Sequence, residues 1–351
     1  MSEPKTYLTL QSVALPFLAL AAFTAFCYFA SPILIPIFVS ISLAYMLSPF
    51  ISLLDRLKIP HFISVLIVLL ASVIIVGFLS YLIFNQANSL VQELPNYWDR
   101  ILLYLTQLRE SLIDKGLIPP GQGIDLESLR FKDFSWVPNF LARGLGSLFS
   151  FVFGSIFVFF LTLFILNDYP YMKTKIIKAF GSSNEELSGK ILTEINQQIG
   201  SYVLVKFSIT LALSLIYTIG FLLLGVNYAY IWGPLAGFLN LVPYIGPFFG
   251  LFPPLIVAGI QFKSIFPMLW IFIFYEAVQL LEGNFVTPKL LENRINLSSL
   301  AILISFMFWA WLWGAIGIIL AVPITAAIKV ACDHVESLKP IGIILGGKKE
   351  K

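Results

Sequence analysis

The chain has 351 residues, of which 58% are hydrophobic and only 12% are charged, and its formal net charge is +3. A soluble domain carries about 25% charged residues, whereas here five long runs contain none, at 6–54, 62–92, 144–167, 207–262 and 295–328. A membrane-spanning helix needs about 20 apolar residues. These values exclude a soluble globular enzyme, a disordered chain and a secreted disulfide scaffold.

The uncharged runs contain eight segments that we predict to span the membrane as helices. At about 1.5 Å per residue the 6–54 run alone would reach roughly 74 Å, whereas the hydrocarbon core is about 30 Å thick. We expect this run to fold back at Ser31-Pro32, and the 207–262 run to fold back at Gly225–Tyr228. The prediction is an all-α polytopic membrane protein with spans at approximately 11–30, 32–54, 62–85, 146–167, 203–225, 229–260, 265–287 and 299–329.

The distribution of Lys and Arg predicts the orientation of these spans. With a cytoplasmic N-terminus, 14 of the 22 basic residues fall on the inner side, and six of the other eight lie in the long 86–145 segment. Short cytoplasmic loops are enriched in Lys and Arg, while long loops translocate regardless of charge. We therefore predict a membrane protein with both termini cytoplasmic. Its regions are spans one to three (1–85), an extracytoplasmic segment (86–145), spans four to eight (146–335) and a tail (336–351).

Two polar segments interrupt the spans. In the 86–145 segment, apolar residues at helical spacing predict an amphipathic helix that ends at Gly116. Its role is open between packing or oligomer contact and gating. Before the fifth span, Ser183 and Glu186 have the spacing of a capping box, which predicts a cytoplasmic helix over 183–202. The apolar stripe of the first helix consists of Ile101, Leu105, Leu108 and Leu112.

The sequence lacks the residue patterns of an enzyme site. Its only histidines, His61 and His334, lie at opposite ends of the chain, and neither metal-ligand spacings nor a nucleophile elbow occur. Gly342–Lys349 approximates a phosphate-binding loop but lacks the Ser or Thr. The few basic residues are scattered, which is not typical of nucleic-acid binding. We expect no enzyme activity, no metal, no cofactor and no nucleic-acid partner.

The stretch from Gly233 to Pro254 is rich in helix-breaking residues, with five prolines and four glycines in 22 positions. An interior proline costs about 3 kcal/mol in a helix, and freed carbonyls in the membrane need protein or water around them. This favours a helix broken within the membrane or a re-entrant hairpin. The alternative is a kinked helix that packs through its glycines. The candidate hinge residues are Gly233, Gly237, Pro243, Gly246, Pro247, Gly250, Pro253 and Pro254.

Polar side chains follow in the next span, which carries Glu276, Gln279, Glu282 and Asn284 before Pro288, a further candidate hinge residue. The first three are three residues apart, so they form a slanting strip on one side of the helix. Polar residues in a membrane span are expensive and often functional. Together with Asn240 they are our candidate ion or substrate ligands. The alternative for Glu282 and Asn284 is an interfacial position in contact with solvent.

The final span contains Gly314, Gly317 and Pro323 behind three tryptophans, and so repeats the helix-breaking character more weakly. We interpret the tryptophans as interfacial or packing residues. Two interrupted segments in successive hairpins are typical of a transporter binding site, so these three residues join the candidate hinge set.

Several of these stretches resemble the autoinducer-2 exporter family of bacterial membrane proteins. The resembling stretches are Asn240–Pro247, Glu282–Lys289, Gly314–Pro323, Leu166–Asp168 and Gln197–Tyr202. The resemblance implies about eight spans with a large external segment after the third, and a homo-oligomer such as a pentamer. It also implies export of small metabolites, with sodium–proton exchange in some members.

We therefore predict a transporter that exports a small polar metabolite or signal by ion-coupled alternating access. Its partners would be the solute, sodium or protons, the lipid bilayer and further copies of the chain. A cation–proton antiporter using the same carboxyl groups is the first alternative. An oligomeric membrane scaffold without transport is the second.

Overall fold

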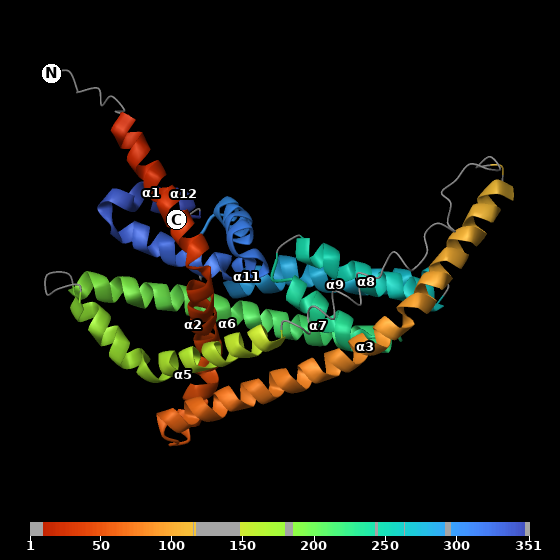
Figure 1. Ribbon diagram of the computed structural model, residues 1–351, viewed down its shortest axis with the longest axis horizontal. Coiled ribbons are helices and arrows are strands. Elements are labelled where there is room, and N and C mark those ends of the chain that lie inside the picture. The colour runs from red at the N-terminus through yellow and green to blue at the C-terminus, as the bar shows by residue number, and fades with distance from the viewer. Residues whose placement is uncertain are drawn as a thin grey trace. The chain divides into compact units, whose positions relative to one another are not determined.

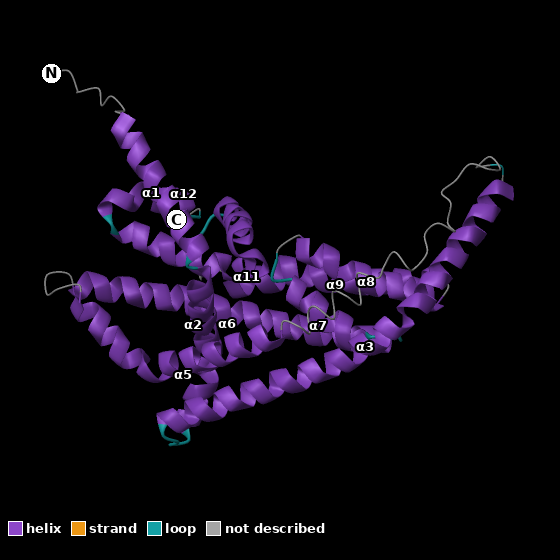
Figure 2. Ribbon diagram, in the orientation of Figure 1, coloured by secondary structure: helices purple, strands orange, loops and turns teal. Residues whose placement is uncertain are grey.

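The computed structural model describes residues 10–114, 116, 148–179, 185–242, 245–262, 264–291 and 296–347. Within these ranges the regular structure is helical, without strands (Figures 1 and 2), which confirms the all-α prediction. The helices are α1 Leu10–Phe29, α2 Ser31–Arg56, α3 His61–Asp114, α5 Leu148–Ala179, α6 Glu185–Leu223, α7 Ala229–Leu239, α8 Ile245–Phe262, α9 Ile265–Leu281, α10 Thr287–Leu291, α11 Ser299–His334 and α12 Lys339–Leu345, with a π-helix η2 at Glu282–Val286 and a 3-10 helix η3 at Glu336–Leu338.

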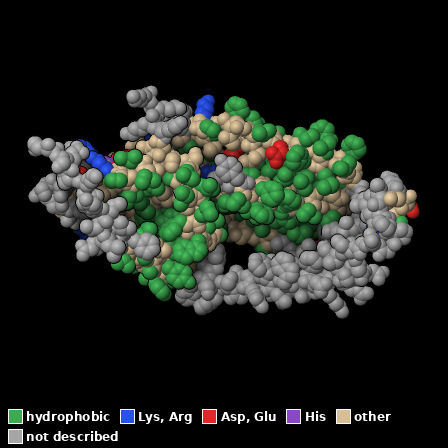
Figure 3. Space-filling view, turned by 90° about the horizontal axis from the view of Figure 1, so that it is seen from above, with side chains coloured by type: hydrophobic (Ala, Val, Ile, Leu, Met, Phe, Trp, Pro, Cys, Tyr) green, Lys and Arg blue, Asp and Glu red, His purple; other side chains and the backbone are tan. Residues whose placement is uncertain are grey.

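Six described helical segments are long and apolar enough to cross a membrane, at Ser31–Arg56, His61–Gln86, Ser188–Leu223, Ile245–Phe262, Ile265–Leu291 and Ser299–His334. Shorter apolar helices lie at Leu18–Phe29, Gly154–Tyr169 and Ala229–Leu239. Hydrophobic side chains form broad patches on the described surface that Figure 3 shows, and many large apolar side chains are exposed. An apolar surface of this extent is expected where lipid is the solvent. The chain is a multi-pass helical membrane protein.

The chain forms two compact units. The first comprises Met1–Val65, Ile156–Val203 and Asn293–Lys351, and the second comprises Leu66–Ser155 and Leu204–Glu292. The core of the first unit includes Cys27, Phe306, Trp309, Trp313 and Leu320. The core of the second includes Leu213, Tyr217, Phe221, Ala236, Leu251, Ile271 and Tyr275, from α6, α7, α8 and α9.

The junction of α1 and α2 differs from the predicted fold-back. Ala30 alone separates the two helices, with φ −85° and ψ 2°. Its amide donates to the Phe26 carbonyl at 2.8 Å, and the Leu34 amide donates to the Ala30 carbonyl at 2.9 Å. The helical hydrogen-bond pattern therefore resumes directly on both sides. The chain bends at this position because Pro32 lacks an amide donor, but it does not reverse.

Two predicted pairs of helices are each one helix. α3 has 54 residues and runs without a break from the third span to Asp114, a length of about 80 Å. Gly116, with φ 69°, follows its end. Similarly, α6 joins the predicted cytoplasmic helix to the fifth span. The apolar stripe of the 86–145 segment lies outside the side chains that the structure describes, as do Ser183 and residues 117–147 altogether.

The predicted sixth span, 229–260, is a helical hairpin made of α7 and α8. The Asn227 amide donates to Gln261 Oε1 at 2.9 Å, and Gln261 Nε2 donates to the Gly225 carbonyl at 2.7 Å. The two ends of the hairpin therefore lie together, so the segment does not cross the membrane once as a single span. Of the two predicted forms of the break, the structure has the re-entrant hairpin. Pro243, within the turn, lies outside the described residues.

The predicted eighth span folds back in the same manner within the first unit. Gly314 interrupts α11 with φ 64° and ψ −142°, a combination that only glycine adopts readily. Ser305 Oγ, before the break, donates to the Ala321 carbonyl after it at 3.1 Å and lies 2.6 Å from Thr325 Oγ1. A Cβ atom at Gly317 would lie 1.9 Å from the Trp309 carbonyl oxygen, so the two arms touch through backbone. Pro323 is buried in the second arm.

Candidate functional site

Glycines bring the backbone of α7 directly against α6. A Cβ atom at Gly233 would lie 2.5 Å from the Thr218 amide nitrogen, and one at Gly237 would lie 2.7 Å from the Ser214 amide nitrogen. Contacts this short are possible only without a side chain. The order of the contacts also shows that α7 runs antiparallel to α6. The glycines therefore serve helix packing, as the kinked-helix alternative predicted, although the helix is also broken, as the first interpretation predicted.

The hairpin turn is equally tight. A Cβ atom at Gly246 would lie 1.7 Å from the Leu239 carbonyl oxygen, and one at Gly250 would lie 3.2 Å from Ala236 Cα. The carbonyl of Pro247 is paired, because the Tyr275 hydroxyl of α9 donates to it at 2.8 Å. The neighbouring prolines Pro253 and Pro254 lie inside α8. This packing places Asn240, the residue that follows α7, beside α9.

The end of α9 widens into a π-helix before Pro288. Proline has no amide to donate and its ring clashes with the preceding turn, and the helix meets this demand with η2, in which the Thr287 amide donates to the Glu282 carbonyl. The wider turn brings the Thr287 hydroxyl into a hydrogen bond with Glu282 Oε1. Single π-turns of this kind are frequent at functional sites.

A buried polar network connects four elements of the second unit. Asn240 and Glu282 are 4% and 6% exposed. Gln279 Nε2 donates to Asn240 Oδ1 at 3.1 Å and to Glu282 Oε2 at 3.4 Å. Lys206 Nζ of α6 lies 3.8 Å from Glu282 Oε1, and both side chains are almost fully buried. The network therefore contains one cation and one anion, linked through an amide to the hairpin turn.

Two stacked tyrosines adjoin this network. The rings of Tyr217 and Tyr275 are 4.6 Å apart with an interplanar angle of 14°. The Tyr217 hydroxyl donates to Gln279 Oε1 at 3.2 Å. Every polar atom of the Gln279 side chain is thus engaged, so its position is held from both sides.

The structure brings together three of the five predicted ligands, Asn240, Gln279 and Glu282. Glu276 is half-buried and has no hydrogen bond or ion pair to another described residue. Asn284 is exposed and donates to the Leu280 carbonyl at 3.0 Å. Sequence reasoning missed Lys206, Tyr217 and Thr287. Of these only Lys206 carried a signal, because it is the charged residue that begins the longest uncharged run.

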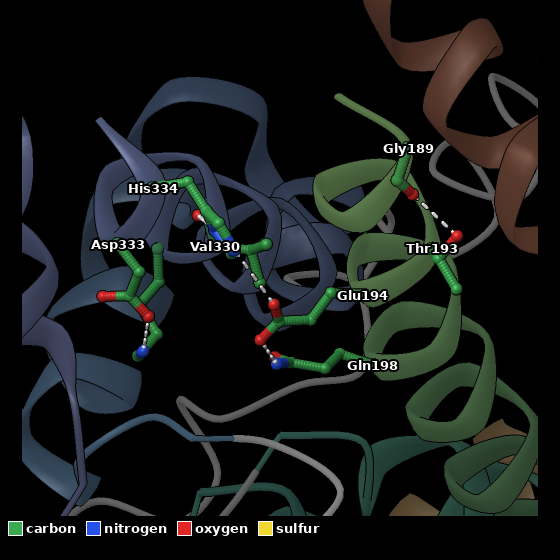
Figure 4. A network of polar contacts seen from close by, with 8 residues as sticks. Gly189, Thr193, Glu194, Gln198, Val330, Asp333 and His334 are labelled. Carbon is green, nitrogen blue, oxygen red and sulfur yellow. Dashed lines mark hydrogen bonds and ion pairs between the residues drawn. The ribbon is translucent and has the colours of Figure 1, made fainter. Parts of the chain in front are cut away.

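A second polar cluster lies in the first unit, between α6 and the end of α11 (Figure 4). His334 Nε2 lies 3.5 Å from Glu194 Oε2, and Gln198 Nε2 donates to Glu194 Oε1 at 3.0 Å. Lys329, 3% exposed, pairs with Asp333 one turn later. An open pocket of about 600 Å³ adjoins the cluster, lined by Ile177, Gly189, Lys190, Thr193, Glu194, Gln197 and His334. Among the described residues, no group of three His, Cys, Asp or Glu side chains is arranged to hold a metal ion.

The sequence profile of the AI-2E family transporters matches residues 17–337. The AI-2 transport protein TqsA of Escherichia coli K12 is 27% identical over 323 residues, which cover 90% of this chain and 90% of TqsA. A protein of Borreliella burgdorferi is 28% identical over 316 residues, covering 90% of this chain and 84% of its own length. One of Haemophilus influenzae is 28% identical over 324 residues, covering 90% and 91%. The names of the last two also refer to transport.

Proposed function

Because the chain belongs to the AI-2E family of transporters, we propose that it exports a small polar solute by alternating access, coupled to an ion gradient. One observation carries this proposal, the buried network of Lys206, Glu282, Gln279 and Asn240 at the turn of a re-entrant hairpin. Ionisable residues within a membrane protein are expensive, and they mark ion and substrate pathways.

The proposed moving part is the α7–α8 hairpin. The side-chain amide of Asn240, at the beginning of its turn, is hydrogen-bonded to Gln279 of α9. The contact of the hairpin with α6 is made through Gly233 and Gly237. Discontinuous helices with binding groups at their breaks are typical of secondary transporters. A solute that binds to amides and a neutral ion pair would be small and polar. The name of the E. coli relative assigns AI-2 to that protein, and AI-2 is therefore the first solute to test.

A cation–proton antiporter is the second candidate, and the oxygen atoms around Lys206 favour it. Glu282, Thr287, Asn240 and Gln279 together supply carboxylate, hydroxyl and amide oxygens close to one another. Oxygen ligands of these kinds suit hard cations. In this proposal the Lys206 ammonium occupies the cation position until an incoming sodium ion displaces it. A scaffold without transport would have no use for such a network, and we rank it last. A homo-oligomer, with a pentamer as the expected form, remains a prediction.

The hairpins also support a proposal for membrane sidedness. Because α7–α8 returns to the side on which it starts, the chain between α8 and α9, which carries Lys263, lies on the same side as residues 224–228. The chain that follows α9, with Lys289 and Arg294, then lies on the inner side. Lys263 becomes the only basic residue after α2 in a short outer loop, in better agreement with the enrichment of Lys and Arg inside. We propose an inner-membrane location with the C-terminal tail in the cytoplasm. A cytoplasmic N-terminus remains a prediction.

Flux measurements with the purified protein in liposomes test the proposal. Vesicles loaded with AI-2 or with sodium are placed in a proton gradient, and the flux of each is followed for the wild type, Glu282→Gln and Glu276→Gln. We expect AI-2 flux that Glu282→Gln abolishes and that Glu276→Gln, at a residue outside the network, retains. Sodium-driven proton movement without AI-2 flux would favour the antiporter instead. If Glu282→Gln leaves both fluxes intact, the network is not the coupling site.

A further inference from the structure

The charge of Glu282 determines how the Gln279 amide is oriented. An ionised carboxylate only accepts hydrogen bonds, so the atom of Gln279 that faces Glu282 Oε2 at 3.4 Å must be the nitrogen. The opposite orientation would place an amide oxygen against the carboxylate. Tyr217 permits both orientations, because a phenol hydroxyl either donates or accepts. Glu282 is therefore the group that selects between them.

Gln279 in turn determines the orientation of Asn240. Its nitrogen also faces Asn240, at 3.1 Å, so the facing atom of Asn240 must be the oxygen. This leaves Asn240 Nδ2 buried and without a partner among the described residues. A buried donor without an acceptor destabilises a structure by about 1–3 kcal/mol. The end of the hairpin thus presents a hydrogen-bond donor that the protein itself does not satisfy.

A second unpaired polar group lies at the same level of the helix pair. Thr210 is 1% exposed, and its hydroxyl also has no partner among the described residues. It precedes Ser214 by one turn on α6, and Asn240 follows Gly237 by three residues on the antiparallel α7. The contact of Gly237 with Ser214 therefore sets Asn240 and Thr210 opposite one another. Neither group is bonded to the other, so a donor and a hydroxyl at this level are both left for a hydroxyl or carbonyl oxygen of a solute.

We propose that Gln279 and Asn240 form an amide relay that converts the charge of Glu282 into affinity for a solute oxygen. This rests on the proposed transport function and deepens it. With Glu282 ionised, Asn240 presents its NH₂ group and the solute oxygen binds. When Glu282 takes up a proton, its O–H donates to Gln279 Oε1, Gln279 turns over, and its nitrogen donates to the Tyr217 hydroxyl. Asn240 then donates to the same Gln279 oxygen and presents its own oxygen, which repels the solute.

The relay makes proton binding and solute binding mutually exclusive at one site. One proton is taken up by Glu282 as the solute leaves, and it is released when Glu282 ionises again, so protons that enter drive the solute outward. The titratable groups that act on Glu282 are Lys206 and Tyr217 of α6, and Tyr217 in turn interacts with Tyr275 and Glu276 of α9. The α7–α8 hairpin brings no charged side chain, and Lys289 of α10 is exposed.

Solid-state NMR tests the relay without any solute. The full-length protein is labelled with ¹⁵N-asparagine and reconstituted in liposomes, and the Asn240 Nδ2 resonance is identified by its loss in Asn240→Leu. Glu282→Gln imitates the protonated carboxyl, so we expect it to shift this resonance at neutral pH. In a Gln279→Met background, or in Gln279→Leu if the first does not fold, the same Glu282→Gln change should leave the resonance in place. The Asn284 resonance, outside the network, should not move in any variant and reports that the fold is intact.

The relay would be overturned if Glu282→Gln in the wild-type background left the chemical shift of the Asn240 Nδ2 resonance unchanged. A shift of the same size in the Gln279→Met background would overturn it too, because the effect would then not pass through Gln279. Proton-driven AI-2 flux in the liposomes is measured on the same samples. Flux with an unmoved resonance removes the relay but keeps the proposed function, whereas a coupled resonance without flux of AI-2 or sodium keeps the relay and removes the proposed function.

Discussion

Replacing Lys206 with Met removes the cation next to Glu282 and leaves a buried carboxylate without an ion-pair partner. The Lys206 and Glu282 side chains are 12% and 8% exposed, and Nζ and Oε1 are 3.8 Å apart. At an effective dielectric constant of about 20, two unit charges at this distance attract each other by about 4 kcal/mol. Breaking one side of a buried pair typically destabilises a protein by about 3–5 kcal/mol. Because Gln279 and Thr287 still donate to the carboxylate, we expect the lower end, about 3 kcal/mol.

A double-mutant cycle separates this effect from lost packing. In Lys206→Met/Glu282→Gln no charge is left unpaired, so we expect most of the stability to return, to within about 1 kcal/mol of the wild type. Unfolding in mixed micelles, titrated with dodecyl sulfate and followed by circular dichroism, gives the free energies. Lys289→Met, at an exposed lysine of α10, is the matched control and should change stability by less than about 0.5 kcal/mol. The reasoning is refuted if the double variant loses the sum of the two single losses.

Three further changes test the geometry around the network. Gly246→Ala inserts a methyl group against the Leu239 carbonyl at the end of α7 and should destabilise the protein by about 3 kcal/mol or more. The control Gly77→Ala, with nothing within 4 Å of its new methyl group, should be neutral or stabilising. Both are measured by thermal unfolding, and an equal loss of stability in the two variants would count against the tight turn. Tyr217→Phe leaves a buried amide oxygen unpaired and should cost about 1–3 kcal/mol in the same assay, and no loss would show that this bond is not formed. In cells that produce a cysteine-free variant of the protein, Ser264→Cys should react with an impermeant thiol reagent from outside, and Asn296→Cys should react only after lysis. The re-entrant hairpin predicts this pattern, whereas a single 229–260 span predicts the reverse.

The sequence was sufficient to predict the ligands that share a local pattern. Gln279 and Glu282 are three residues apart on one helix, and Asn240 lies in the densest group of prolines and glycines, so periodicity and composition identify them. Lys206 could not be assigned, because its partner is 76 positions away and only the packing of α6 against α9 brings it to Glu282. By charge alone, Lys206 was counted among the basic residues that predict the orientation of the spans in the membrane.

The number of crossings was the weaker part of the prediction. Hydropathy measures whether a segment prefers lipid, but a hairpin that enters and returns is as apolar as a helix that crosses. The broken stretch at 233–254 was predicted because each proline removes a helical hydrogen bond. In α11 the reversal depends on the single positive φ of Gly314, and a lone glycine in an apolar run is not distinctive. The bend at Ala30 shows the opposite error, since Ser31-Pro32 looks like a turn but continues as a helix.

The absence of charge from 207–262 also bears on how the protein responds to electrical potential. Moving one elementary charge through a potential of 100 mV changes its energy by about 2.3 kcal/mol. The α7–α8 hairpin carries no charged side chain at all, and the Lys206–Glu282 pair beside it has no net charge while Glu282 is ionised. The membrane voltage therefore exerts almost no force on the hairpin side chains as they move. Any current, or any voltage dependence of the transport rate, therefore measures the charge of the solute together with that of the proton on Glu282.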